Sequence, residues 1–204
     1  MPGADPRAMS HSWLFTGPPG SGRSLAAIDF AAALMCTDPE EPGCGRCEAC
    51  RAVLETKQHT DLVLVDPQEV IIPVDTVREV IGRAASLPTV APWRVVIFNN
   101  ADRLNNNGAN ALLKTVEEPP ARTVIIMCAP SDAPEDFSQT LRSRCRHLYI
   151  PSPSVESITA QLVSEGASDH DAHLAALTSL RHVGRARRLV NDPAVQKRRA
   201  VAIN

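Results

Sequence analysis

Residues 17–24 read Gly-Pro-Pro-Gly-Ser-Gly-Arg-Ser and match a phosphate-binding loop at every position but one. In such a loop the glycines let the backbone turn tightly around phosphate groups, and the helix that follows points its N–H groups and positive dipole end at them. The candidate nucleotide-binding residues of this loop are Gly17, Gly20, Gly22, Arg23 and Ser24. Arg23 stands where the motif requires lysine, whereas Ser24 keeps the hydroxyl that faces Mg²⁺.

A P-loop enzyme also needs acidic residues after a neighbouring strand, one to hold Mg²⁺ and usually a second to orient the attacking water. The apolar run at residues 94–98 fits that strand, but Asn99 and Asn100 follow it. An amide adds no charge and cannot act as a base. Each such loss costs roughly 3 kcal/mol, about two orders of magnitude in rate. Together with Arg23, these residues predict a chain that does not hydrolyse ATP and binds it weakly or not at all.

Four cysteines gather within a short segment and could hold a metal ion. They are Cys36, Cys44, Cys47 and Cys50, which form two overlapping C-x-x-C turns and one further thiol. Four thiolates suit tetrahedral Zn²⁺, and a site with no open position is structural rather than catalytic. The alternatives are two disulfides or four free thiols. Disulfides are disfavoured in a cytosolic chain, and cysteines so close in sequence bridge only with strain.

The composition is that of a globular protein, with 44% hydrophobic and 22% charged residues in 204. The net charge of −2 gives no bulk electrostatic reason to bind nucleic acid. No apolar run approaches the length of a membrane span, and residues 1–10 lack the apolar region of a signal peptide. We therefore expect no membrane partner, a cytoplasmic location and a flexible start at residues 1–10.

Apolar runs alternate with helical patterns after the phosphate-binding loop. Strands are predicted at residues 62–65, 94–98, 123–128 and 146–150, and helices at 75–87, 107–118 and 134–142. Runs that are apolar on both faces and separated by helices indicate a parallel sheet covered on both sides. The predicted fold is α/β, of the P-loop NTPase type, with the cysteine module inserted after the first helix.

A break at residues 151–154, Pro-Ser-Pro-Ser, separates this part from purely helical patterns. Helices are predicted at residues 155–165, 170–180, 184–191 and from 193 to the end. The expected domains are a flexible start at 1–10, a P-loop core at 11–150 with the zinc module at 36–50, and a small helical lid at 151–204.

Several segments together carry a resemblance to a known family. They are the P-loop written with arginine, the cysteine module after its helix, Ala-Asp-Arg-Leu at 101–104, Asn-Ala-Leu-Leu-Lys-Thr-Val-Glu-Glu-Pro-Pro at 110–120, and Leu-Arg-Ser-Arg-Cys at 141–145. This combination resembles the clamp-loader branch of the AAA+ family, and within it the delta-prime-like subunits of bacterial DNA polymerase III. The resemblance runs from about residue 11 to residue 188.

The resemblance implies a place in a loader of several subunits that opens a ring-shaped sliding clamp and sets it on primer–template DNA. It implies a stator-like subunit that is not itself an ATPase and that meets the clamp and DNA through the assembly. It also implies a third, helical collar domain that forms most subunit contacts, and this sequence ends at Asn204, before such a domain.

Ser143, Arg144 and Cys145 match the Ser-Arg-Cys motif of that family. There the arginine is a finger that reaches the γ-phosphate of ATP held by the neighbouring subunit, a role that suits a rigid, always charged guanidinium. The resemblance therefore assigns Arg144 a catalytic role in trans. The alternative is a surface arginine held in a salt bridge.

Arg185 lies in a segment that resembles the family's lid motif, in which an arginine rests against bound nucleotide. The alternative is a helix start with Arg185 on a solvated basic face. For the whole chain, the alternatives are an active ATPase motor subunit of the same loader and a zinc-ribbon protein that binds nucleic acid. The second would need a basic, aromatic surface near the cysteines, which the sequence does not show.

Overall fold

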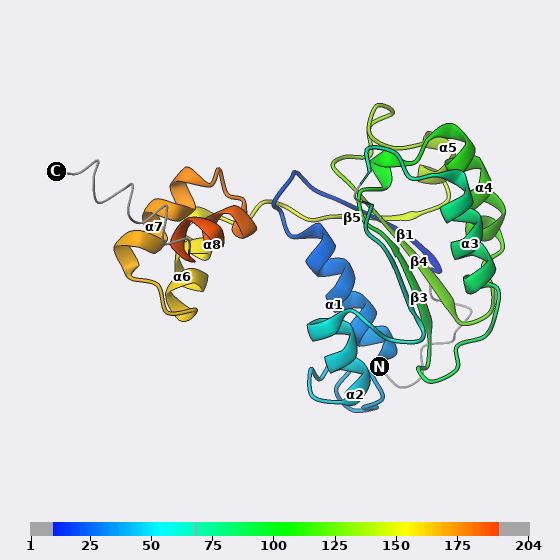
Figure 1. Cartoon of the computed structure of the whole chain (residues 1–204), viewed down its shortest axis with the longest axis horizontal. Helices are drawn as coiled ribbons and strands as arrows, with labels where there is room; N and C mark the ends of the chain where they lie inside the picture. The colour runs from blue at the N-terminus through cyan, green and yellow to red at the C-terminus, as the bar shows by residue number, and fades with distance from the viewer. Residues whose placement is uncertain (1–9, 68, 192–204) are drawn as a thin grey trace. The chain divides into compact units, whose positions relative to one another are not determined.

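The computed structural model describes residues 10–67 and 69–191. The chain divides into two compact units, the first made of the residues up to Thr16 and of Arg23–Tyr149. The second is made of Gly17–Gly22 and of the residues from Ile150 onward. Figure 1 shows both units, with the sheet in the first and the last three helices in the second. The expected flexible start and the helix predicted from residue 193 lie outside the described residues, apart from residue 10.

A five-stranded parallel sheet forms the centre of the first unit. Its strands are β1 (Ser12–Thr16), β2 (Leu62–Val65), β3 (Arg94–Phe98), β4 (Thr123–Ala129) and β5 (Arg146–Tyr149). Their order is β2-β3-β4-β1-β5. The carboxyl ends of β1 and β3 therefore flank the end of β4. This arrangement places the residue before the phosphate-binding loop and the residues after β3 at one edge of the sheet.

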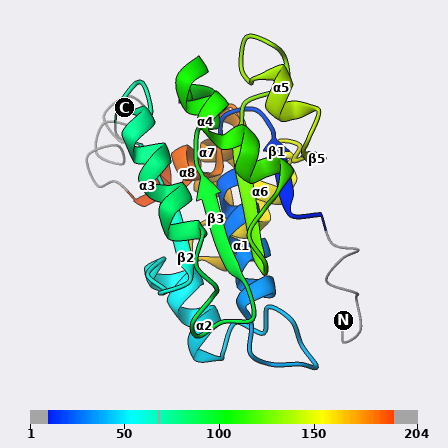
Figure 2. The ribbon, with the colours of Figure 1, turned by 90° about the vertical axis from the view of Figure 1, so that its right-hand side faces the viewer.

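Helices cover both faces of the sheet, as predicted (Figures 1 and 2). One face packs against α1 (Arg23–Met35), α2 (Glu48–Arg51) and the π-helical turn η1 (Ala52–Thr56). The other packs against α3 (Val74–Ala84), α4 (Asn106–Glu117) and α5 (Gln139–Arg142), and the 3₁₀ turn η2 (Ala101–Arg103) follows β3. Successive residues of a strand point to opposite faces of the sheet. In β1, Leu14 packs in the core on the α3–α4 side, and Phe15 packs in the core on the α1 side.

Two predicted helices differ from the observed ones. The helix predicted at 134–142 is confined to α5, because Asp136 accepts a hydrogen bond from the Ser131 hydroxyl at 2.7 Å and holds the preceding residues in turns. The helix predicted at 75–87 ends at Ala84 and begins one residue earlier. Pro73 occupies its N-cap position, so Asp75 lies in the first turn and pairs with Arg78 instead.

The second unit contains α6 (Val155–Ser164), α7 (Asp169–Thr178) and α8 (Val183–Asn191), which share a small core built largely of alanine. Ser154 and Ser168 cap α6 and α7, each accepting a backbone N–H three residues later. The helical part predicted after residue 151 is therefore observed. Across the described residues, no helix combines the length and the apolar character that a membrane crossing requires.

A buried ion pair ties together the amino ends of β2 and β3. The Asp61 carboxylate is fully buried and accepts a hydrogen bond from Arg94 Nη2 at 2.8 Å. It also accepts three backbone N–H bonds from residues 89–91, at 2.9, 2.7 and 2.9 Å. Arg94 Nη1 in turn donates to the carbonyl groups of Arg83 and Ser86, at 2.6 and 2.8 Å. One pair thus fixes the end of α3, the loop after it and two strands.

Burial alone would raise the pKa of Asp61, but the N–H groups of residues 89–91 and the Arg94 guanidinium outweigh it and hold the pKa well below its usual range. Because the folded pKa lies below the unfolded value, this pair contributes its full stability at neutral pH. That contribution is lost as the pH falls below about 3.9, the unfolded value.

Asp61→Asn is therefore expected to lower the free energy of unfolding of the first unit by about 3–5 kcal/mol, because it leaves Arg94 buried without its counter-charge. Denaturant unfolding followed by tryptophan fluorescence measures this, since both tryptophans, Trp13 and Trp93, lie in that unit. Asp75→Asn is the control, because that carboxylate is 86% exposed. Equal midpoints for the two variants would contradict the role assigned to Asp61.

Candidate nucleotide and metal sites

The phosphate-binding loop connects β1 to α1 as the sequence predicts. Gly20 and Gly22 adopt positive φ angles of 88° and 92°, and Ser21 N–H donates to the Pro18 carbonyl at 3.0 Å. Within the second unit, Gly20 lies so close to His182 that a Cβ would be 2.6 Å from the His182 Cα. Glycine is therefore required at position 20 for its backbone angle and for its lack of a side chain. Gly17, the first glycine of the loop, directly follows Thr16.

Arg23, the first residue of α1, is only 9% exposed. Its Nη2 lies 3.4 Å from Oδ1 of Asn100, a long hydrogen bond to a neutral amide. The structure therefore brings together two of the positions at which the sequence departs from an active P-loop site. Ser24 follows in the first turn of α1 and is half-buried.

The two residues directly after β3, Asn99 and Asn100, supply amide groups and no carboxylate. Asn99 is 8% exposed, and its N–H donates to the Val65 carbonyl at 2.9 Å. Its buried Oδ1 accepts no hydrogen bond from any described residue. Asn100 has a left-handed backbone, with φ of 53°, and begins the 3₁₀ turn η2. Neither side chain can take a proton from water or neutralise Mg²⁺.

Arg144 lies in the turn between α5 and β5, at the amino end of β5. Trp13 pairs with Arg146 and Thr16 with Tyr149, so β5 runs alongside β1 in the same direction. The phosphate-binding loop begins where β1 ends, whereas Arg144 precedes the point where β5 begins. The strand β5 spans about 10 Å between these two edges of the sheet. Arg144 thus lies at the opposite edge of the sheet from Thr16, the residue that precedes the loop.

The Arg144 guanidinium is held by its own chain on two of its three nitrogens. Nε donates to Oε1 of Glu117 at 2.5 Å, and Nη1 donates to the Thr140 carbonyl at 2.8 Å and to Oγ of Ser143 at 3.2 Å. Nη2 donates to no described residue, and the side chain is 36% exposed. The ion pair with Glu117 agrees with the alternative of a surface arginine held in a salt bridge. An arginine finger requires a nitrogen that can donate to a phosphate, and Nη2 is such a nitrogen.

Cys145, the third residue of that motif, is a packing residue. It is 8% exposed, and burial raises the pKa of its thiol to about 12. Cys128 has the same character, fully buried with its pKa raised to about 12 by burial. Neither thiol is a nucleophile at neutral pH.

Arg185 is exposed on the first turn of α8 in the second unit. Its backbone N–H donates to the His182 carbonyl at 3.0 Å. The neighbouring Arg187 pairs with both carboxylate oxygens of Glu165, at 2.9 and 3.1 Å from Nε. The Arg185 side chain makes no such pair within the described part of the chain.

The four clustered cysteines bring their sulfur atoms to within 4.8 Å of one another. The Cys36 sulfur lies 3.6 Å from that of Cys44 and 3.8 Å from that of Cys47. A tetrahedral thiolate site with metal–sulfur bonds of about 2.3 Å separates its sulfurs by about 3.8 Å. The arrangement therefore fits a single metal ion, and the described cysteines form no disulfide.

Backbone N–H groups point at the sulfur atoms of Cys44 and Cys47. Cys47 N–H lies 3.4 Å from the Cys44 sulfur, and Cys50 N–H lies 3.4 Å from the Cys47 sulfur. Burial opposes ionisation of Cys47, but N–H groups of Thr37 and Cys50 outweigh it and lower its pKa to about 6. Cys50 behaves in the opposite way, because burial raises the pKa of its thiol to about 12. A metal ligand must be deprotonated, so the surroundings favour the thiolate at Cys47, whereas metal binding has to displace a proton from Cys50.

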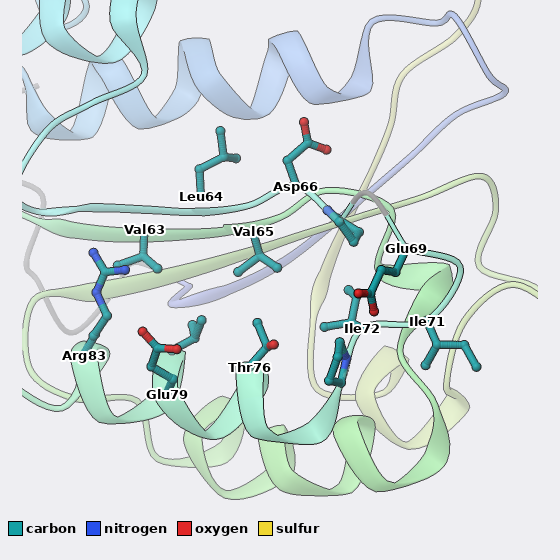
Figure 3. A pocket seen from close by; sticks show the side chains of 13 residues that line it. Val63, Leu64, Val65, Asp66, Glu69, Ile71, Ile72, Thr76, Glu79 and Arg83 are labelled. Atoms are coloured by element: carbon teal, nitrogen blue, oxygen red, sulfur yellow. The ribbon is translucent and has the colours of Figure 1, made fainter.

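A pocket of about 390 Å³ opens beside the edge strand β2 and α3 (Figure 3). Val63 and Val65 form its apolar wall, and Glu79 and Arg83 project into it from α3. None of the residues predicted to bind nucleotide, metal or a partner's phosphate lines it. The sequence predictions therefore concern other parts of the surface.

Sequence reasoning missed Glu117 as the partner of Arg144. Glu117 is the last residue of α4, 27 residues before Arg144. A salt bridge across that separation leaves no local pattern. The one signal was that the helix carrying Glu117 and the turn carrying Arg144 both belong to segments of the family resemblance.

The fold is that of a P-loop NTPase of the AAA+ class. It combines a parallel sheet, a P-loop after the first strand, a cysteine module and a helical unit that follows the sheet. A solved DNA polymerase III gamma-subunit-related protein from Thermotoga maritima has the same fold, with a TM-score of 0.57 and 19% identity. That likeness covers 92% of this chain and 56% of the other.

The sequence comparisons identify the family. A family model described as "DNA polymerase III, delta subunit" matches residues 4–154, and the chain belongs to this family. DNA polymerase III subunit delta' of Pseudomonas aeruginosa is 35% identical over 78% of this chain and 49% of its own length. Its Escherichia coli counterpart is 34% identical over 82% of this chain and 50% of its own length. The chain spans about half the length of these curated relatives.

The reduced chain is expected to bind one equivalent of a thiolate-preferring divalent metal, because four sulfurs already lie at tetrahedral spacing. Cys47→Ser removes one ligand and is expected to weaken binding by at least about tenfold, measured by competition with a chromogenic chelator. Cys128→Ala, which removes a thiol outside the cluster, should bind as the unchanged chain does. Equal affinity in all three proteins would contradict a four-cysteine site.

Proposed function

We propose that this chain acts as a stator-like, non-hydrolysing subunit of a DNA polymerase III clamp loader in the cytoplasm. It does not turn over ATP itself, and it supplies Arg144 as an arginine finger to the ATP bound by a neighbouring subunit. Its partners are the other loader subunits, and it meets the sliding clamp and primer–template DNA through the assembly. The family membership and the delta' relatives support this proposal.

One observation carries the proposal: within the first unit, Arg144 lies at the amino end of β5, at the opposite edge of the sheet from the carboxyl ends of β1 and β3. An arginine placed there is remote from Asn99 and Asn100, the nucleotide-site residues that follow β3. Its Nη2 remains available to an acceptor from another molecule. A guanidinium offers a charged, planar donor set that matches phosphate oxygens.

The chain's own nucleotide site supports the non-hydrolysing half of the proposal. Arg23 faces the neutral Asn100 amide, and Asn99 offers no carboxylate for Mg²⁺ or for water. Ser24 alone keeps a metal-facing group, so nucleotide binding is weak or absent. Arg185 would then have no phosphate of its own to contact and serves the solvated face of α8.

The metal in the cysteine module is, we propose, Zn²⁺ in a structural role. Four thiolates leave no open coordination position, which removes the possibility of an activated water. The sulfurs join the core on the α1 side, where Cys36 and Cys50 are buried. The ion would hold residues 36–50, which follow α1, against the core on that side of the sheet.

A second function, that of an active ATPase motor subunit of the same loader, rests on the retained Ser24 hydroxyl. The two functions differ in one measurable property. A titration of the chain with labelled ATP and Mg²⁺ is expected to show binding no tighter than millimolar, and single-turnover mixing is expected to show no cleavage. Cleavage at an ordinary enzyme rate would establish the motor function instead.

Arg144→Ala is expected to slow ATP turnover at the neighbouring site that it contacts by about 10³-fold, while the loader still assembles. Steady-state ATPase of the reconstituted loader measures this, and size-exclusion chromatography checks assembly. Arg146→Ala removes the same charge two residues further on, where the side chain stacks on Trp13, and should leave turnover unchanged. Unchanged ATPase in Arg144→Ala would refute the finger.

A further inference from the structure

We infer that Glu117 is the positioning residue for Arg144. In this account the Glu117 carboxylate holds the guanidinium by its Nε edge, so that Nη2 points outward to a phosphate of the neighbouring subunit. The inference rests on the proposed function, because it requires Arg144 to act on a partner's nucleotide. Glu117 itself touches no substrate.

The contacts fix the direction of the free nitrogen. A guanidinium is planar and rigid, so two anchored nitrogens determine where the third one points. Glu117 anchors Nε at 2.5 Å and the Thr140 carbonyl anchors Nη1 at 2.8 Å. Nη2 is the nitrogen that no described residue engages. The two anchors come from α4 and α5, which pack against each other in the same core.

Glu117 stands on a firmly placed element. It is the last residue of α4, directly after the buried Val116, whose carbonyl accepts the Ser12 hydroxyl at 3.3 Å. Asn105 caps the other end of α4 by accepting the Gly108 N–H at 2.8 Å. A carboxylate on a helix end that is tied to strand β1 can hold a partner side chain in one orientation.

Stability does not account for this pair. The Arg144 and Glu117 side chains are 36% and 47% exposed, and ion pairs with that exposure contribute little to folding. A long, flexible arginine gains most from such a contact by losing its conformational freedom before the partner arrives. The entropy cost of aligning the finger is then not borne during catalysis.

Glu118 provides a matched control. It is the next residue, it is also exposed, and its side chain forms no ion pair with any described residue. Glu118→Ala removes the same formal charge from the neighbouring position without removing a contact with Arg144.

The test measures ATP turnover of the reconstituted loader containing Glu117→Ala, Glu117→Gln or Glu118→Ala, alongside Arg144→Ala. Glu117→Ala is expected to lower kcat by about tenfold, with nucleotide affinity and assembly unchanged. Glu117→Gln keeps an oxygen that can accept from Nε, so its kcat should stay within about threefold of the unchanged loader. Glu118→Ala should match the unchanged loader.

A double variant separates positioning from a general effect. If Glu117 acts only through Arg144, Glu117→Ala adds nothing to the loss caused by Arg144→Ala. Multiplicative losses, or a kcat for Glu117→Ala equal to or above that of the unchanged loader, would overturn the inference while leaving the finger intact. Normal turnover in Arg144→Ala would overturn the proposed function itself, and this inference with it.

Discussion

The common direction of the five strands is the constraint on which the rest of the molecule depends. In a parallel sheet all carboxyl ends meet at one edge and all amino ends at the other. The carboxyl end of β1, Asn99 and Asn100 therefore lie at one edge, and Arg144 lies at the opposite one. Arg23 and Arg144, two guanidinium groups, thereby have different surroundings. Arg23 lies against the Asn100 amide, and Nη2 of Arg144 donates to no described residue.

Long-range polar contacts hold this arrangement in register. The Asp61–Arg94 pair joins β2, β3 and the end of α3 at the amino edge, where the strands begin. The cysteine module packs into the core on the α1 side and leads from α1 into α2. Neither the Asp61–Arg94 ion pair nor the cysteine module includes a residue predicted to bind nucleotide.

Local patterns in the sequence were enough to predict the phosphate-binding loop, the cysteine cluster and the alternation of strands and helices, because each depends on residues close in the chain. The partner of Arg144 and the ion pair of Asp61 could not be found in this way, since 27 and 33 residues separate the members. The helix predicted at residues 134–142 was too long, because the side-chain contact between Ser131 and Asp136 favours turns over helical periodicity. The absence of a carboxylate at positions 99 and 100 was visible in the sequence. The direction in which Arg144 offers its Nη2 required the structure.

The central claim is that Arg144 completes a nucleotide site belonging to another subunit. A structure of the assembled loader with a non-hydrolysable ATP analogue tests it most directly. The account predicts Arg144 Nη2 at about 3 Å from an oxygen of the neighbour's γ-phosphate, with Nε still on Glu117. A Mg²⁺–nucleotide in this chain's own phosphate-binding loop, with Arg144 remote from every phosphate, would contradict it.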